Sequence, residues 1–338
     1  MAQGESASGL KSAEAPNAET GAARFDAEIR AFIAESGLDF PQDAGARPIA
    51  EQRAFYDAMC RRFAAPRPDR AAVEDTSIAG PAGAVPIRRY QPEEQTARAP
   101  ETPQILYLHG GGWHLGGLDS HDDVCAEMAA ETGMPVTAVG YRLAPEHAHP
   151  AAYEDAQAAA EALLGEDRPL IIAGDSVGGC LAAALLIAFR RGGGAQAALR
   201  GALLIYPSLT GGAQSLPAYR EHAAAPLFTA ADNTANTARY AGPGADAAAL
   251  AASDPRFAPL IAPDLSGCAP CHALAVEVDP LRDDAAAFAA RLSAAGARAS
   301  ASTHAGLPHG CLRARRTSLK ARMFFEAALS ALRHLRDM

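Results

Sequence analysis

The chain has 338 residues, of which 49% are hydrophobic, and it carries a formal net charge of −9. This length is enough for one large domain or two ordinary ones, with a sizeable buried core. The negative charge argues against nucleic acid or an anionic membrane surface as the main partner.

The N-terminal part of the chain is expected to lie outside the main domain. Residues 1–21 are rich in Ala, Ser, Glu and Gly, and this composition is typical of a disordered tail. Residues 22–72 predict helices that contribute to a cap, because side chains such as Phe25 and Ile29 recur at helical spacing. Residues 85–90 then predict an edge strand.

From residue 104 onward, apolar strands alternate with helices. Continuous apolar strands between helices are typical of an α/β fold with a mostly parallel central sheet and helices on both faces. Strands are expected at 105–108, 136–139, 169–173, 202–206, 274–278 and 297–303, and helices at 120–132, 151–164, 180–190, 284–295 and 317–335.

One long segment interrupts this alternation. Residues 209–252 are rich in Ala, Gly and Pro and contain one helix-like piece, at 229–240. A compact α/β domain rarely needs so long a connection, so this segment is predicted to be a cap insertion over the active site. Residues 73–208 and 253–338 would then form the catalytic domain.

The strongest candidate for chemistry is Ser176, which lies in the sequence Gly174-Asp175-Ser176-Val177-Gly178. An apolar strand precedes this sequence and a helical pattern follows it. That context turns a weak G-x-S-x-G match into a predicted nucleophile elbow, a sharp turn that exposes a serine hydroxyl to a base.

The sequence His109-Gly110-Gly111-Gly112-Trp113 follows another predicted strand. Backbone N–H groups of successive glycines can hold a developing oxyanion, and the N–H of Val177 would add a further donor. A flexible loop or a phosphate cradle is the alternative, although the G-K-[ST] ending of a P-loop is missing. His109 is expected to brace this loop by hydrogen bonds.

A serine nucleophile on this kind of sheet needs an acid and then a histidine later in the chain. Asp279 follows the predicted strand 274–278, at the sheet edge where sites form, and Glu277 is the weaker alternative. Asp283 and Asp284 are interpreted as residues that favour a helix start.

Two histidines are candidates for the base. His309 lies in a predicted loop after the last strand, and His304 is expected to end that strand. Spacing alone favours His309 only modestly.

The chain resembles the hormone-sensitive-lipase-like family of α/β-hydrolases, the esterases with an H-G-G-G loop. The resemblance covers about residues 85 to 310. The matching stretches are 109–113, 120–122, 141–147, 150–155, 174–179, 253–255, 279–283 and 309–310.

This resemblance implies an α/β-hydrolase fold with a helical cap and a serine carboxylesterase activity on short-to-medium acyl esters, without a metal or cofactor. It implies Ser176 as nucleophile, Asp279 as acid and His309 as base. It also implies an oxyanion hole formed by the N–H groups of Gly111, Gly112 and Val177. A small-molecule ester is the expected partner, and a homodimer is possible by the same resemblance.

Three positions depart from the family pattern. Val177 replaces the common alanine after the nucleophile, Gly140 stands where an aspartate is usual, and Cys311 replaces an aromatic residue. None of them removes a catalytic group, so they affect the expected pocket shape and local stability. Five residues are candidates for the substrate pocket, with core packing as the alternative for each: Trp113, Phe32, Leu209, Phe228 and Tyr240.

Two other functions remain open. An amidase or lactonase would use the same triad on a different bond. A non-catalytic small-molecule receptor could share the fold, but such receptors in plants lack the catalytic histidine, whereas His309 is present.

The remaining signals favour a cytoplasmic protein without a metal site. No apolar stretch approaches the roughly 18–20 residues of a membrane span, and no secretory signal is recognised. The pair Cys268 and Cys271 is expected to be two free thiols in a loop. The histidines lack zinc-site spacing. The basic cluster 313–316 is interpreted as a solvated helix start.

Overall fold

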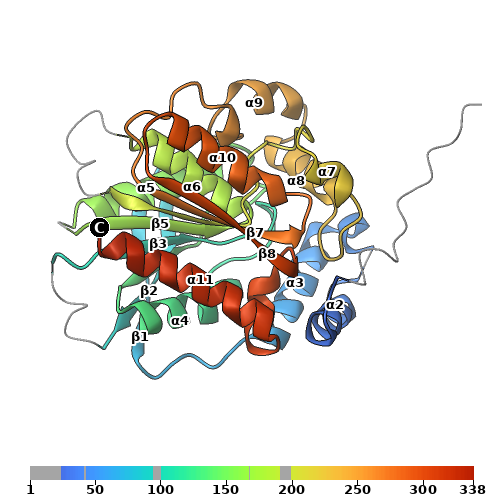
Figure 1. Cartoon of the computed structure of the whole chain (residues 1–338), viewed down its shortest axis with the longest axis horizontal. Coiled ribbons are helices and arrows are strands. Elements are labelled where there is room, and N and C mark those ends of the chain that lie inside the picture. The colour runs from blue at the N-terminus through green and yellow to red at the C-terminus, as the bar shows by residue number, and fades with distance from the viewer. Residues whose placement is uncertain (1–23, 42, 94–99, 167, 191–198) are drawn as a thin grey trace, which may run out of the picture.

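The computed structural model describes residues 24–41, 43–93, 100–166, 168–190 and 199–338 (Figure 1). The predicted disordered tail, residues 1–21, lies outside the described residues. The strands are β1 (Ala71–Gly80), β2 (Gly83–Pro92), β3 (Gln104–Leu108), β4 (Val136–Val139), β5 (Leu170–Asp175), β6 (Leu199–Ile205), β7 (Cys271–Val278) and β8 (Ala299–Pro308). The helices are α2 (Ala27–Asp39), α3 (Ile49–Phe63), α4 (Asp122–Thr132), α5 (Ala151–Leu164), α6 (Val177–Ala188), α7 (Ala218–Glu221), α8 (Ala230–Ala241), α9 (Ala247–Ser253), α10 (Arg282–Ala294) and α11 (Leu319–Arg336).

The eight strands form one sheet in the order β1-β2-β4-β3-β5-β6-β7-β8. Strands β3 to β8 pair in parallel, and β1 and β2 add an antiparallel hairpin beside β4. This is the mostly parallel sheet that the alternating pattern predicted. Because β3, β5, β6 and β7 are parallel, their carboxyl ends lie at one edge of the sheet, where loops can converge.

Alternate side chains of the central strands bury against opposite layers of helices, as the two-residue period of a strand requires. Leu106 and Ile172 pack in one core cluster with residues of α5, α6 and α10. Ile105 and Ile171 pack in the other cluster with residues of α4 and α11. Figure 1 shows these two helical layers above and below the sheet. The predicted α/β-hydrolase architecture is confirmed.

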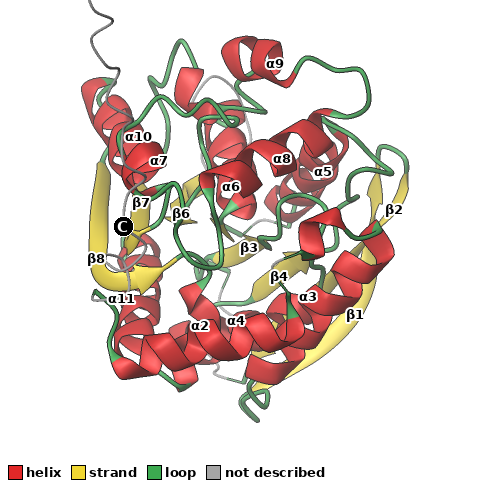
Figure 2. Ribbon diagram, turned by 90° about the vertical axis from the view of Figure 1, so that its right-hand side faces the viewer, coloured by secondary structure: helices red, strands yellow, loops and turns green. Residues whose placement is uncertain are grey.

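The N-terminal helices and the segment 209–252 gather at one end of the sheet. Figures 1 and 2 both show α2, α3, α7 and α8 at this end. Arg53 of α3 ties the N-terminal helices to the glycine loop, because it donates to the carbonyl of His114 and to the carboxylate of Glu146. The predicted cap segments therefore lie at the sheet edge where the carboxyl ends of the parallel strands lead into loops.

Two sequence predictions about strands are wrong. Strand β2 is not an edge strand, because β1 covers it along ten paired positions. The sequence did not reveal β1, since most of its side chains are exposed and its apolar residues do not alternate with polar ones. Strand β8 extends to Pro308, so His304 lies inside the strand instead of ending it.

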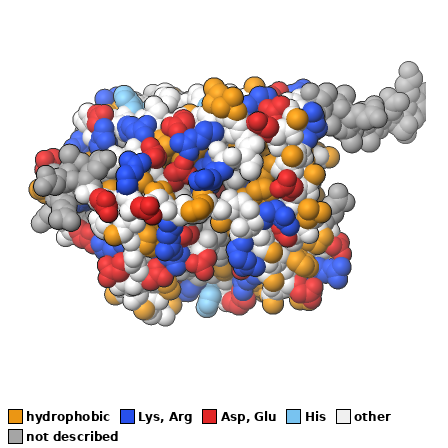
Figure 3. Space-filling view, turned by 90° about the horizontal axis from the view of Figure 1, so that it is seen from below, with side chains coloured by type: hydrophobic (Ala, Val, Ile, Leu, Met, Phe, Trp, Pro, Cys, Tyr) orange, Lys and Arg blue, Asp and Glu red, His pale blue; other side chains and the backbone are white. Residues whose placement is uncertain are grey.

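The basic cluster 313–316 is not a solvated helix start. Arg315 is buried and donates to the carboxylates of Asp123 and Glu127 at 2.6 and 2.8 Å. Arg313 donates to the carbonyl of Ser120. The arginines therefore join the segment before α11 to α4 and its preceding turn. On the face drawn in Figure 3, acidic and basic side chains are interspersed.

The six cysteines are unpaired and buried. Cys271 is the first residue of β7, which corrects the expectation that it lies in a loop. No helix within the described ranges is long and apolar enough to cross a membrane.

Candidate active site

Ser176 lies at the sharp turn between β5 and α6. Its backbone has φ 57° and ψ −119°, a strained conformation for a residue with a side chain. The flanking glycines permit the turn: a Cβ on Gly178 would lie 1.9 Å from the carbonyl oxygen of Leu108, and one on Gly174 would lie 2.4 Å from the carbonyl oxygen of Gly178. This local geometry is that of the predicted elbow.

Ser176, His309 and Asp279 form a chain of hydrogen bonds. The Ser176 Oγ lies 2.9 Å from Nε2 of His309, and the Nδ1 of His309 lies 2.7 Å from Oδ2 of Asp279. Because a carboxylate only accepts, Nδ1 donates to it, and Nε2 is left to accept the serine hydroxyl proton. The other oxygen of Asp279 accepts from the N–H of Leu281 at 2.8 Å, which fixes the carboxylate.

Aromatic rings hold the imidazole of His309 on two sides. Phe228 stacks on it with ring centroids 4.5 Å apart, and Tyr206 packs against it at 4.7 Å. All three catalytic candidates are buried, with Asp279 completely so. The ring of His309 is therefore held in the orientation that both hydrogen bonds need.

The rival acid and base are engaged elsewhere. Glu277 accepts hydrogen bonds from Arg24 and from the N–H of Gly306. His304 packs edge-on against Phe324. The structure thus brings together Asp279 and His309, and neither of the two alternatives.

The glycine loop lies beside the elbow, and the Asp175 carboxylate connects them. Its Oδ1 accepts from the N–H of Gly110 and from the Tyr107 hydroxyl, each at 2.9 Å, and lies 3.3 Å from Nε2 of His121. Burial by itself would raise the pKa of Asp175, but the charge and hydrogen bonds of His121 and the Tyr107 hydroxyl hold it below its usual value. The sequence alone does not indicate a role for Asp175, although this residue lies within the nucleophile motif.

The predicted oxyanion donors belong to two segments that meet here. Gly111 and Gly112 have φ values of 125° and 61°, which favour glycine. The N–H of Val177 is at the first position of α6, where helix geometry leaves it without a carbonyl partner. Among the described residues, none accepts a hydrogen bond from these three N–H groups.

His109 packs at the base of the glycine loop, as expected. Its Nδ1 lies 2.8 Å from the carbonyl of Gly110, its ring stacks on Tyr141 at 4.2 Å, and the Tyr141 hydroxyl donates to its carbonyl. Burial, followed by the nearby His121, lowers the pKa of His109 to about 4. The side chain is therefore neutral near pH 7 and suits a bracing role.

The segment 209–252 is held by the start of α10. The buried Asp284 accepts from the N–H of Leu209 at 2.7 Å and from the Tyr219 hydroxyl at 3.2 Å, while Asp283 accepts from the N–H of Ala218. Both carboxylates thus do more than favour a helix start. Burial raises the pKa of Asp284 to about 8, and the nearby charge of Asp279 adds to this effect. The hydrogen bonds that Asp284 accepts act in the opposite direction.

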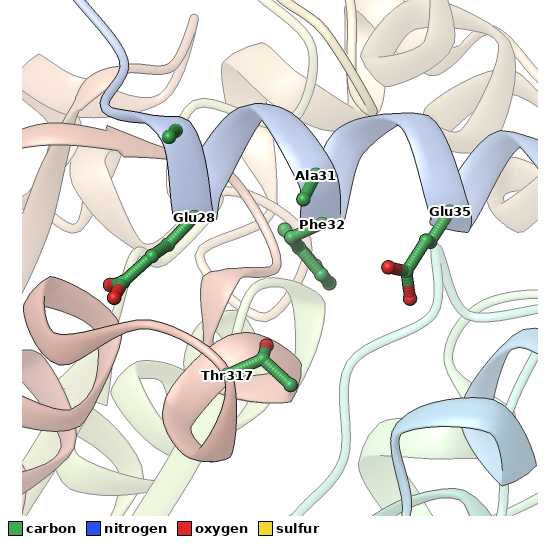
Figure 4. A pocket seen from close by; sticks show the side chains of 6 residues that line it. Glu28, Ala31, Phe32, Glu35 and Thr317 are labelled. Atoms are coloured by element: carbon green, nitrogen blue, oxygen red, sulfur yellow. The ribbon is translucent and has the colours of Figure 1, made fainter.

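The five pocket candidates lie in different surroundings, and their role in a substrate pocket stays a prediction. Phe228 touches His309, as described above. Trp113 and Tyr240 stack with ring centroids 4.4 Å apart, and Leu209 is buried in the same core cluster. Phe32 lines a surface pocket of about 380 Å³ with residues of α2 and Thr317 (Figure 4). None of the three catalytic candidates lines that pocket.

Two of the three departures from the family pattern lie in the core. Val177 and Cys311 are buried, and burial raises the pKa of the Cys311 thiol well above its ordinary value. A Cβ on Gly140 would lie 3.3 Å from the carbonyl oxygen of Pro86, so a larger residue would need that neighbour to move. No group of three or more His, Cys, Asp or Glu side chains within the described residues could hold a metal ion.

Comparison with known proteins gives a consistent picture. A family model described as the alpha/beta hydrolase fold matches residues 105–313. The protein named Esterase LipI of Mycobacterium tuberculosis is 38% identical over 245 residues, which is 70% of this chain and 74% of that protein. The ethyl acetate hydrolase of Pseudomonas putida is 38% identical over 239 residues, 68% of this chain and 72% of that one.

Solved structures agree with these relatives. The hyperthermophilic esterase from the archaeon Pyrobaculum calidifontis has a TM-score of 0.77 and 30% identity, covering 86% of this chain and 94% of that chain. A bacterial heroin esterase has a TM-score of 0.80 and 27% identity, covering 93% of this chain and 98% of that chain.

Proposed function

This chain belongs to the alpha/beta hydrolase family, and we propose that it is a serine carboxylesterase that uses Ser176, His309 and Asp279 on small acyl esters. The observation that carries the proposal is the hydrogen-bond chain from the Ser176 hydroxyl through His309 to Asp279, with spacings of 2.9 and 2.7 Å. Relatives and solved structures named as esterases support the same reaction class.

In the proposed mechanism, His309 takes the proton of the Ser176 hydroxyl as the oxygen attacks the ester carbonyl. Asp279 orients the imidazole and stabilises its charged form. The alcohol leaves with a proton from His309, and an acyl-enzyme on Ser176 remains. Water, deprotonated by His309, then attacks this acyl group and releases the acid.

The negative charge that develops on the carbonyl oxygen needs donors placed in advance. The N–H groups of Gly111, Gly112 and Val177 supply them in this proposal. The hydrogen bond from the Gly110 N–H to Asp175 fixes the start of the glycine loop against the elbow. Such fixed donors need no reorganisation when the charge appears, which is why they lower the barrier.

The cap is part of the proposal. Residues 22–72 and 209–252 would cover the site, and residues 73–208 with 253–338 would form the catalytic domain. The ion pair of Arg53 with Glu146 and the contact of Phe228 with His309 support this division. A cytoplasmic location and a homodimer remain predictions, the second testable by light scattering on the purified protein.

Replacement of the nucleophile tests the reaction. Ser176→Ala should lower kcat for p-nitrophenyl acetate by about 10⁴- to 10⁶-fold, because the attacking hydroxyl is lost. Ser253→Ala, at an exposed serine that ends α9, is the matched control and should retain activity. Near-normal turnover by the Ser176→Ala protein would refute the proposal.

A fluorophosphonate probe separates an enzyme from a non-catalytic receptor, because covalent labelling at Ser176 requires an activated hydroxyl. A matched p-nitrophenyl ester and p-nitroanilide pair then separates an esterase from an amidase. Failure of the probe to label Ser176 in the folded protein would favour the receptor.

A further inference from the structure

The helix α8 of the segment 209–252 lies against two parts of the site. The residues Asn233, Asn236 and Tyr240 are spaced by three and four positions and so share one face of this helix. Asn233 contacts Ser208, Asn236 contacts Gly112, and Tyr240 stacks on Trp113. The inner face of α8 therefore runs along the glycine loop and the segment that follows β6.

Asn233 is connected to the backbone of the nucleophile through Ser208. Its Oδ1 accepts from the Ser208 hydroxyl at 3.2 Å, and the N–H of Ser208 donates to the carbonyl of Ser176, also at 3.2 Å. The side chain is only 1% exposed, and its Nδ2 is buried without a hydrogen-bond partner among the described residues. Exchange of the amide oxygen and nitrogen would leave the oxygen without a partner instead.

An unsatisfied amide at this position is costly. A buried polar group without a partner costs about 1–3 kcal/mol, and native proteins keep few of them. A ligand bound between α8 and the segment that follows β6 would complete the hydrogen bonds of this amide.

Asn236 adds a second amide above the glycine loop. A Cβ on Gly112 would lie 2.6 Å from the Nδ2 of Asn236, so this amide lies directly against the backbone that carries the proposed oxyanion donors. Within the described part of the chain, no side chain or backbone group hydrogen-bonds the Asn236 amide. The cap therefore presents two amides to the site, beside the ring of Phe228 that stacks on His309.

We propose, on the basis of the carboxylesterase function above, that Asn233 and Asn236 bind an oxygen substituent of the substrate. The preferred esters would carry an ether, hydroxyl or carbonyl oxygen a few atoms from the scissile carbonyl, in either the acyl or the alcohol part. A site built to hydrogen-bond a polar group rejects the analogue that lacks it, because its own buried groups are then left unpaired.

Two pairs of nearly isosteric esters test this preference. In the acyl arm, p-nitrophenyl methoxyacetate is compared with p-nitrophenyl butyrate. In the alcohol arm, 2-methoxyethyl acetate is compared with butyl acetate. Each ratio of kcat/KM is divided by the ratio of the hydroxide-catalysed rates, which removes the difference in intrinsic reactivity.

The wild-type enzyme should favour the oxygenated ester by at least about fivefold after this correction, in one arm or both. The arm that shows the preference identifies the part of the substrate that the amides contact. Asn233→Leu and Asn236→Leu should each move the corrected ratio in that arm toward one. Ala235→Leu, which places the same side chain on the exposed face of α8, should leave it unchanged.

The results of these ester comparisons distinguish a failure of this inference from a failure of the proposed esterase function. A wild-type enzyme that hydrolyses both esters of each pair with corrected ratios near one would overturn this inference and leave the esterase intact. A wild-type ratio that neither asparagine variant changes would also overturn it. If Asn233→Leu does not fold, the wild-type ratio and the half-buried Asn236 still decide. Absence of hydrolysis of every ester would refute the proposed function itself.

Discussion

The carboxylate of Asp175 accepts a hydrogen bond from the backbone N–H of Gly110 at 2.9 Å. Asp175 precedes the proposed nucleophile and Gly110 begins the glycine run. Their contact therefore sets the distance between the nucleophile and the proposed oxyanion donors. The same oxygen also accepts from Tyr107. Asp175 is thus a positioning residue that does not itself touch the reacting atoms.

Asp175→Ala should lower kcat by roughly 10²-fold, since a shift of about 1 Å in a catalytic group can cost that much. The KM for p-nitrophenyl acetate should change much less, because the loop positions the transition state. Asp175→Asn retains an acceptor oxygen and should recover part of the loss. Equal activity of the alanine and wild-type enzymes, measured on folded protein, would disprove this role.

Gly178 offers a test of the elbow itself. A Cβ at this position would lie 1.9 Å from the carbonyl oxygen of Leu108, so Gly178→Ala must push β3 and α6 apart. We expect a loss of about 1–3 kcal/mol or more in the free energy of unfolding by urea, together with a loss of activity.

Gly37 is the control for the glycine substitution. It lies inside α2, is exposed, and has no atom within 4 Å of an added Cβ. Gly37→Ala should therefore stabilise the protein by roughly 0.5–1 kcal/mol, through the higher helix propensity of alanine. The elbow interpretation requires the two alanine variants to change stability in opposite directions.

Much of the fold follows from periodicity. The strand 136–139 and the helix 151–164 have the predicted bounds, because each is a short buried run or a clear helical repeat between turn residues. Strand β1 could not be predicted in the same way. Its outer position exposes most of its side chains, and the two-residue pattern that marks a buried strand is lost.

The site followed from the sequence only in part. Chain order and resemblance suggested Ser176, Asp279 and His309. Spacing alone favoured His309 over His304 only modestly, whereas the path of β8 brings His309 to Ser176. Asn233 left no signal, because an asparagine in a helical stretch is ordinary on an exposed surface. Its importance arises from burial against Ser208, a tertiary contact.

The ion pairs of Arg315 are likewise a tertiary contact that the sequence does not indicate, and they give a further prediction. Arg315 is 2% exposed, and its guanidinium lies between the carboxylates of Asp123 and Glu127. Arg315→Met would leave both carboxylates buried without this partner, so we expect a loss of about 3–5 kcal/mol in urea unfolding. The neighbouring Arg316 is exposed, and Arg316→Met should change stability by no more than about 0.5 kcal/mol. Similar losses in the two variants would contradict the buried ion-pair account.

Asp284 predicts an unusual dependence of stability on pH. Burial raises its pKa in the folded protein to about 8, whereas the unfolded chain has the ordinary value near 3.8. The folded state therefore binds one more proton than the unfolded state between these two pH values. Stability from this group is complete below about pH 4 and is lost as the pH rises through the folded pKa.

Asp284→Asn should remove this dependence, because the amide resembles the protonated acid and can still accept from the N–H of Leu209. The free energy of unfolding of the variant minus that of wild type should rise by up to about 1.4 kcal/mol per pH unit between about pH 4 and pH 8, then level off.

Asp283→Asn is the control. Burial acts to raise the pKa of Asp283, but hydrogen bonds, chiefly from Arg282, hold this pKa below its ordinary value. The difference in free energy of unfolding between Asp283→Asn and wild type should therefore stay constant from pH 5 to pH 8. A difference for Asp284→Asn that is flat over this interval would show that Asp284 is ionised in the folded protein, and the buried carboxyl would then need a cation or donor that its contacts with Leu209 and Tyr219 do not supply.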